Sequence, residues 1–165
     1  MVLGLALVLA VIVTGTLTGV FQLYSHTVMP GLGRTDDRTF VGAFQAMDRA
    51  IVNPLFLSMF LGAPVLTALA LVLSFGDRWR SMLPWLVAAL VLYLIVIAVT
   101  FRVNVPLNDA LKAAGDPDRI ADLAATRRDF NEARWVRWNL VRSVTCTAAF
   151  VCLTWALVLY GRVTA

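Results

Sequence analysis

The chain has 165 residues, 60% of them hydrophobic, with a mean hydropathy of +0.80 and a formal net charge of +4. A soluble domain is about 45–50% apolar; here the excess lies in long uninterrupted runs, which indicates an integral membrane protein. The basic residues flank those runs without a zinc-finger, phosphate-loop or basic-aromatic motif, so contact with membrane lipids rather than nucleic acid explains the charge.

The first expected span covers residues 2–24 and contains no charged residue. At about 1.5 Å per residue it can cross a hydrocarbon core of about 30 Å. Because no basic residue precedes the apolar run, we interpret it as a retained anchor rather than a cleaved signal peptide. Gly15 and Gly19 form a small-residue seam that favours close helix packing, with dimerisation as the less favoured alternative. Residues 30–33, Pro-Gly-Leu-Gly, are expected to break the helix.

An amphipathic helix lying at the membrane surface is predicted next, ending near residue 51. Thr35 is the expected N-cap, and Asp36 and Asp37 suit the positive end of the helix dipole. The apolar positions recur at helical spacing and are Phe40, Val41, Phe44, Met47 and Ile51. The residues assigned to other faces are Arg38, Gln45, Asp48 and Arg49.

Three further spans are expected at about residues 54–75, 82–101 and 143–160. In the polar connection between the last two, Asp116-Pro117 is a helix-start pattern, and we expect helix from there into the fourth span. The prediction is an all-α fold: an integral membrane four-helix transmembrane bundle. It has an interfacial amphipathic helix, a long helical connection before the fourth span, and a single domain over residues 1–165.

Four spans place both chain ends on one side of the membrane and the two longer connections on the other. Those connections, 25–51 and 102–142, carry 11 of the 14 basic residues. The positive-inside rule therefore places them in the cytoplasm and the termini outside. We expect the protein in a bacterial inner (plasma) membrane, and a homo-oligomer is compatible with the sequence.

Polar residues gather at one end of the predicted bundle. Polar side chains near hydrocarbon are costly unless paired or hydrated, so we expect them to face inward and form a pocket. The alternative is a set of ordinary helix-end residues, with Trp79, Trp135 and Tyr160 in an interfacial aromatic belt. The candidate pocket residues are Tyr24, His26, Gln45, Asn53, Asn104, Asn108, Trp135, Trp138, Asn139 and Arg142.

His26 is the only histidine of the chain. A single histidine argues against a multi-histidine metal site and against a haem held by two histidines of one chain. Imidazole titrates near neutral pH, so His26 would serve as a base inside a pocket. The alternative is an ordinary hydrogen-bonding residue at the membrane interface.

Four stretches of the sequence resemble the anthrone oxygenase-like family, a group of small four-helix membrane proteins. In the family's order, they are residues 24–32 (YSHTVMPGL), 44–54 (FQAMDRAIVNP), 104–108 (NVPLN), and Trp135 with Trp138-Asn139 and Arg142. The match extends over nearly the whole chain. Asp48 departs from the pattern, which more often has asparagine there.

The resemblance implies a candidate reaction, the oxidation of anthrones to anthraquinones by dioxygen without metal or flavin. The implied partners are dioxygen and a hydrophobic aromatic molecule that arrives from the bilayer, and no cofactor is expected. By the same resemblance His26 is the candidate base. The candidate oxyanion donors are Asn104, Asn108 and Arg142. Trp135 and Trp138 would stack the substrate, and the further candidate binding residues are Tyr24, Gln45, Asn53 and Asn139.

Two other functions stay open. One is a non-enzymatic membrane protein, a lipid-binding or helper subunit whose polar cluster only holds the helices together. The other, and the least favoured, is transport, because four helices in one protomer leave little room for a gated pathway.

Overall fold

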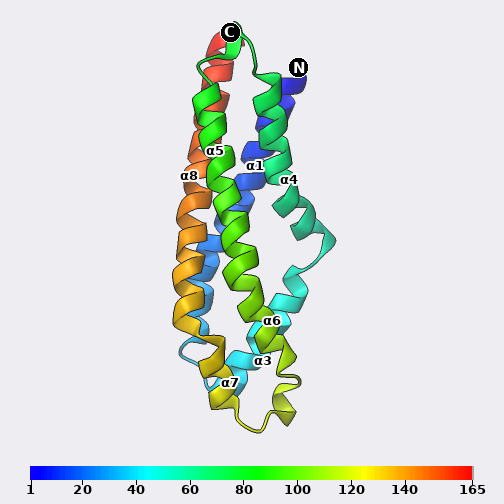
Figure 1. Ribbon diagram of the computed structural model, residues 1–165, viewed down its shortest axis with the longest axis vertical. Coiled ribbons are helices and arrows are strands. Elements are labelled where there is room, and N and C mark those ends of the chain that lie inside the picture. Colours follow the sequence, from blue (N-terminus) through cyan, green and yellow to red (C-terminus); the bar gives the residue numbers. More distant parts are fainter. Residues whose placement is uncertain (165) are drawn as a thin grey trace.

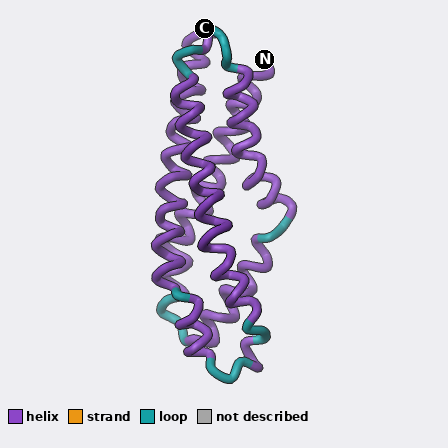
Figure 2. The backbone as a smooth tube through the Cα atoms, viewed as in Figure 1, coloured by secondary structure: helices purple, strands orange, loops and turns teal. Residues whose placement is uncertain are grey.

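The computed structural model describes residues 1–164, in which four long helices run side by side (Figure 1). The helices long and apolar enough to cross a membrane are Val2–Leu32, Pro54–Leu73, Leu83–Ala113 and Leu123–Thr164. Residues 1–164 contain no strand, and loops are short (Figure 2). The predicted all-α four-helix bundle is confirmed, and both chain ends lie at the same end of it.

The first helix is longer than the sequence predicted. α1 (Val2–Leu23) continues through a π-helical turn, η1 (Tyr24–Val28), into α2 (Met29–Leu32). The helix ends at Leu32, inside the expected break of residues 30–33, but Pro30 itself does not interrupt it. The wider winding of the π turn just ahead of the proline accommodates its ring and its missing N–H.

The third span ends in the same way. α5 (Leu83–Val99) continues through a second π turn, η3 (Thr100–Asn104), into α6 (Val105–Ala113), whose first turn contains Pro106. Two of the four long helices therefore carry a π turn closely followed by a proline, at the same end of the bundle. Such turns are rare and frequently mark functional sites.

α3 (Asp37–Ile51) is the predicted amphipathic helix, and it lies with α6 and α7 at the end of the bundle opposite the chain termini (Figure 1). Asp36, not Thr35, is its N-cap: the Asp36 carboxylate accepts a backbone N–H of the first turn at 2.8 Å. Its buried face is wider than predicted because it also includes Gln45 and Asp48.

α4 (Pro54–Leu73) begins where the sequence predicted. The Asn53 side chain caps it by accepting the Phe56 N–H at 3.0 Å. A short turn containing the 3-10 helix η2 (Asp77–Trp79) joins α4 to α5 at the end of the bundle that carries the chain termini.

The connection before the fourth span is helical but interrupted. Asp116 caps only a 3-10 turn, η4 (Pro117–Arg119), before α7 (Leu123–Phe130) begins. Asn131 then ends α7 with a φ of +54°, a left-handed conformation that asparagine tolerates better than most residues. α8 (Glu132–Thr164) follows. The helix expected from Asp116 into the fourth span, with a possible bend, is therefore interrupted at two places.

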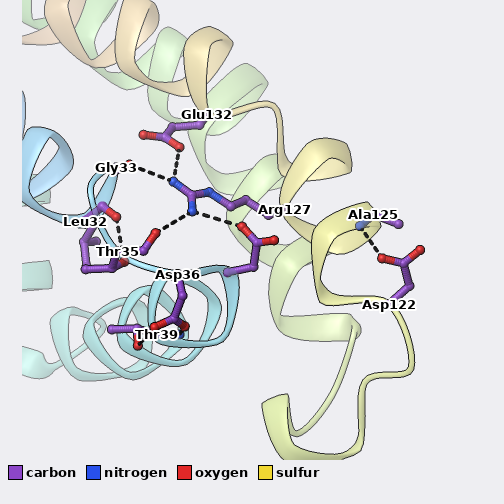
Figure 3. Close-up of polar contacts among 10 residues, drawn as sticks. Leu32, Gly33, Thr35, Asp36, Thr39, Asp122, Ala125, Arg127 and Glu132 are labelled. Carbon is purple, nitrogen blue, oxygen red and sulfur yellow. Dashed lines mark hydrogen bonds and ion pairs between the residues drawn. The ribbon is translucent and has the colours of Figure 1, made fainter.

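Arg127 joins α7 to its neighbours at this end of the bundle (Figure 3). Its guanidinium donates to the carbonyl oxygens of Thr35 at 2.9 Å and Gly33 at 3.2 Å. It also donates to the carboxylates of Asp37 and Glu132, both at 3.1 Å. We call this set of contacts the Arg127 clasp. It ties α7 to the turn before α3 and to the first residue of α8.

Close packing of α1 against α8 explains one of the two glycines of the seam. A Cβ atom at Gly15 would lie 2.8 Å from the Phe150 ring, so only glycine fits there without a shift. Gly19 has open space around its Cα atom.

Three buried apolar clusters follow one another along the bundle, represented by Leu7, Leu17 and Phe44.

Candidate functional site

A cavity of about 140 Å³ lies among the central apolar cluster and the cluster at the α3 end. Five segments supply its walls: the end of α1 with η1, α3, the start of α4, η3 with α6, and α8. Most of the lining side chains are apolar. The polar ones are Tyr24, Asp48, Thr100, Asn108, Trp135 and Arg142.

The cavity reaches the surface between the α3–α4 corner and η3. Three of its lining residues, Val52, Leu57 and Phe101, are 58%, 40% and 56% exposed. In Figure 1 the α3–α4 corner projects away from α5 and α6. An opening bordered by apolar side chains at the ends of membrane-spanning helices suits access from lipid better than access from water.

The two π turns place polar groups in the cavity wall. Tyr24 is the first residue of η1 and Thr100 the first residue of η3, and both line the cavity. The Thr100 hydroxyl donates to the Val96 carbonyl at 2.7 Å and accepts from Arg142 Nη1 at 3.3 Å. The third span therefore contributes to the cavity at the point where its winding changes.

Arg142 is a buried cation without an anionic partner. The residue is 7% exposed, and no carboxylate in residues 1–164 pairs with it. Nη2 donates to Asn139 Oδ1 at 2.7 Å, but the buried Nε has no hydrogen-bond partner in the same stretch. Burying an unpaired charge costs several kcal/mol. A charge kept at that cost indicates a site for an anion or a developing negative charge.

Aromatic rings and an amide hold the guanidinium in place. Arg142 Cζ lies 4.8 Å from the Phe21 ring centroid and 5.6 Å from that of Trp135, within range of cation–π attraction. Asn139 is itself fixed, because its Nδ2 donates to the Phe21 carbonyl at 3.1 Å and to Ser25 Oγ at 2.7 Å. Asn139 is thus a positioning residue for Arg142.

A second polar row crosses the cavity wall from α8 to α3. Trp135 Nε1 donates to Asn108 Oδ1 at 2.7 Å, and Asn108 Nδ2 donates to Asp48 Oδ1 at 2.6 Å. Lys112 Nζ lies 2.7 Å from Asp48 Oδ2. Both ends of the Asn108 amide are therefore bonded to protein groups, which fixes the direction of the Asp48 carboxylate.

Trp135 forms the aromatic wall. It is 3% exposed and packs edge-on against Phe44, with ring centroids 5.5 Å apart, and near Tyr24 at 5.9 Å. The alternative that placed Trp135 in an interfacial aromatic belt is wrong, because its ring lies inside the bundle and its N–H is bonded to Asn108.

Residues 56–152, more than half of the chain, match the family model described as anthrone oxygenase. The chain belongs to the anthrone oxygenase family. It matches no curated protein and no solved structure. The matched part of this anthrone oxygenase family member contains Asn108, Trp135 and Arg142, whereas Tyr24 and Asp48 precede it.

The cavity brings together four of the candidate residues. Tyr24, Asn108, Trp135 and Arg142 all line it. Asn139 lies directly behind Arg142. Helices distant in sequence thus converge on one polar cluster, as the sequence predicted for this end of the bundle.

His26 lies outside the cavity, contrary to the expected convergence. It is exposed, and its Nδ1 is 2.6 Å from Thr27 Oγ1. Two residues along a helix turn the side chain by about 200°. Because Tyr24 faces the cavity, His26 is carried to the opposite side of the same helix.

Four other candidates do not line the cavity. Gln45 is buried. Its side-chain amide Nε2 donates to the carbonyls of Leu111 at 2.8 Å and Gly115 at 3.1 Å, which joins α3 to α6. Asn104 is buried behind the wall and donates to the Trp135 carbonyl at 3.3 Å. Asn53 caps α4, and Trp138 is half-buried on α8. In this family member these residues support the site or lie beside it.

Sequence reasoning missed Asp48 as a cavity residue. A signal was present: Phe40, Phe44 and Asp48 follow one another at intervals of four, which places them on one face of a helix. The apolar lining residues Phe56, Phe60 and Phe101 were also missed, because an apolar residue in a membrane span carries no local sign of whether it faces lipid or a cavity.

Proposed function

We propose that the protein oxidises a hydrophobic aromatic substrate with dioxygen, without a bound metal or flavin, in the cavity beside Arg142. The observation that carries the proposal is a buried, unpaired guanidinium set among aromatic rings. Membership of the anthrone oxygenase family supports this class of reaction.

The shape and lining of the cavity favour a flat apolar ligand. A dry cavity of about 150 Å³ in another protein holds benzene, so about 140 Å³ takes one ring of a polycyclic molecule. The remaining rings would extend through the opening beside Val52, Leu57 and Phe101 toward lipid. Trp135 and Phe44 supply aromatic faces for the enclosed ring.

Arg142 supplies the electrostatic part of the proposed reaction. Removing a proton from the CH₂ group opposite an anthrone carbonyl moves negative charge onto the carbonyl oxygen. A fixed cation in a dry site stabilises that charge without reorganising solvent. Arg142 lines the cavity, and no carboxylate in residues 1–164 neutralises it, so its charge can act on that oxygen.

The overall reaction is balanced with dioxygen as the only co-reactant. The carbanion passes one electron to dioxygen, and the resulting radical pair combines to form a C–O bond. Loss of water then leaves a carbonyl, so that R₂CH₂ and O₂ give R₂C=O and H₂O. One oxygen atom of O₂ enters the quinone and the other leaves as water.

Oxygen uptake by the purified protein in lipid nanodiscs, with anthrone as the substrate, tests the proposal. We expect anthraquinone to form with one ¹⁸O atom when ¹⁸O₂ is supplied. Arg142→Gln should abolish most of the uptake, whereas Arg137→Gln, at an exposed position of the same helix, should leave it unchanged. Folded wild-type protein that consumes no oxygen beyond the spontaneous rate would overturn the assignment.

A structural role for the polar cluster is the second candidate, favoured by one observation. Arg142, Asn139 and Ser25 link α8 to η3 and to the first helix through hydrogen bonds. A lipid-binding or helper subunit would need only this cohesion. It predicts that Arg142→Gln lowers the melting temperature strongly and that anthraquinone does not raise it.

A further inference from the structure

We infer that Asp48 is the base of this reaction: its carboxylate takes the proton from the substrate carbon and later returns it to the reduced oxygen. The inference rests on the proposed function, which needs a base without identifying it. Within residues 1–164, Asp48 is the only carboxylate that lines the cavity. His26, which the family resemblance suggested, does not line it.

Asp48 lines the cavity and has one protein neighbour on each carboxylate oxygen. The residue is 8% exposed, and its Oδ1 accepts from Asn108 Nδ2 at 2.6 Å. Lys112 Nζ lies 2.7 Å from the buried Oδ2, within ion-pair distance. A carboxylate oxygen has two lone pairs, so each oxygen keeps one beyond its present neighbour. The carboxylate can therefore accept a proton while both contacts hold it in place.

The neighbours of Asp48 hold its carboxylate in place. Lys112 also lies 3.0 Å from Asp109 Oδ1, and the side chains of Asp48, Lys112 and Asp109 are 9%, 28% and 61% exposed. The ammonium can therefore shift toward Asp109, near solvent, while Asp48 is neutral. Asn108, held from behind by Trp135, prevents the carboxylate from turning away. Lys112 and Asn108 are positioning residues.

One carboxylate suffices for the proton balance. Asp48 removes the first C–H proton, the carbanion adds dioxygen, and the protonated Asp48 returns the proton to the peroxide anion. The regenerated carboxylate then removes the second C–H proton as the O–O bond breaks. The departing hydroxide takes that proton and leaves as water. Arg142 holds the charge on the carbonyl oxygen while the carbon is deprotonated.

The substitution Asp48→Asn tests the role directly. Asparagine has nearly the shape of aspartate but cannot accept the proton. The variant therefore keeps the side chain's size while removing the proposed base.

The decisive experiment compares Asp48→Asn with a surface carboxylate variant in the same nanodiscs, with anthrone and dioxygen. We expect Asp48→Asn to lose about 10²–10⁴-fold in kcat, the usual contribution of a general base. Asp129→Asn, at an exposed position of α7, is the matched control and should keep wild-type turnover. Quenching of Trp fluorescence by anthraquinone should be the same in the wild type, Asp48→Asn and Asp129→Asn. An active wild type with an equally active Asp48→Asn overturns this inference alone. An inactive wild type overturns the proposed function as well.

A second variant keeps the inference testable if Asp48→Asn folds poorly. Formate should restore turnover to Asp48→Ala, because a small carboxylate can occupy the vacated space and take the proton. His26→Ala should turn over at the wild-type rate. Failure of formate to raise the rate of a folded, anthraquinone-binding Asp48→Ala, or loss of turnover in His26→Ala, contradicts the assignment.

Discussion

Arg127 and Arg142 lie at the same end of the bundle and are used in opposite ways. The Arg127 clasp gives its guanidinium two carboxylates and two carbonyl oxygens near the surface (Figure 3). Arg142 is deeper, has neutral partners only, and keeps one donor unbonded. A cation whose charge is neutralised and whose donors are bonded holds segments together. A cation that no carboxylate of the protein neutralises is available to an anionic ligand.

Arg142→Gln should give the largest effect and separate the two uses. We expect kcat for anthrone to fall about 10²–10³-fold, the typical result of removing one oxyanion donor. Stability should change little, because removing an unpaired buried charge also removes its desolvation cost. Oxygen uptake and thermal unfolding in detergent measure the two quantities. A large fall in melting temperature at unchanged turnover would show that Arg142 holds segments together, as Arg127 does, and does not act in the reaction.

Asn139→Asp gives Arg142 the kind of partner that Arg127 already has. The new carboxylate would lie where Asn139 Oδ1 now accepts from Nη2 at 2.7 Å. We expect turnover to fall about tenfold, equivalent to about 1.4 kcal/mol of lost transition-state stabilisation, because the cation would then be neutralised by the protein. Asn139→Ala is the comparison variant, since it loosens Arg142 without neutralising it. A rate for Asn139→Asp at or above wild type contradicts the proposed use of the charge.

Arg127→Gln should show the reverse pattern to Arg142→Gln. Asp37 and Glu132 are partly exposed, with side chains 40% and 29% exposed, so solvent screening reduces the effect. We expect a loss of about 1–3 kcal/mol in the free energy of unfolding, from several hydrogen bonds lost together. Turnover per folded molecule should be unchanged. Arg128→Gln, at a neighbouring exposed position of α7, is the control.

The smallest expected effect concerns pH and the N-cap of α3. Hydrogen bonds from the Thr39 N–H and hydroxyl lower the pKa of Asp36 below its ordinary value of 3.8. A depressed pKa in the folded state means that the ionised cap stabilises the fold above the ordinary value, and that this stabilisation is lost as the pH falls through the lowered pKa. Hydrogen exchange of the first turn of α3 should therefore differ between wild type and Asp36→Ala at pH 6, and the difference should shrink toward pH 3. A constant difference would contradict the role of the charge.

Sequence patterns predicted the depth of each polar group in the membrane better than its direction. Runs of apolar residues located the spans, and the residues around Arg142 were correctly placed at one end. Direction around the helix axis depends on winding and on tertiary packing. The prediction grouped His26 with the pocket and did not select Asp48 as a site residue. Neither the π turn at Tyr24 nor the packing of α3 against α6 has a local signature.

The end of the first helix shows the same limit. Residues 30–33 were expected to break the helix, and it ends at Leu32, two residues beyond the proline. In an ordinary α-helix Pro30 would clash with the preceding turn. The structure avoids the clash with a π turn, which depends on the neighbouring helices rather than on the Pro-Gly-Leu-Gly sequence itself. Tyr24 and Arg142 line the same cavity because of how the helices pack. The sequence around either residue does not predict it.

Each π turn lengthens its helix by one residue without re-aiming the segment that follows it. A π turn holds one more residue than the α-helical turn it replaces, and both complete about one revolution. Deleting Thr27 from η1, or Arg102 from η3, would therefore restore regular winding and leave α2 or α6 facing the same way. The bundle can thus gain or lose a residue at these two places without losing the direction of the helices beyond them.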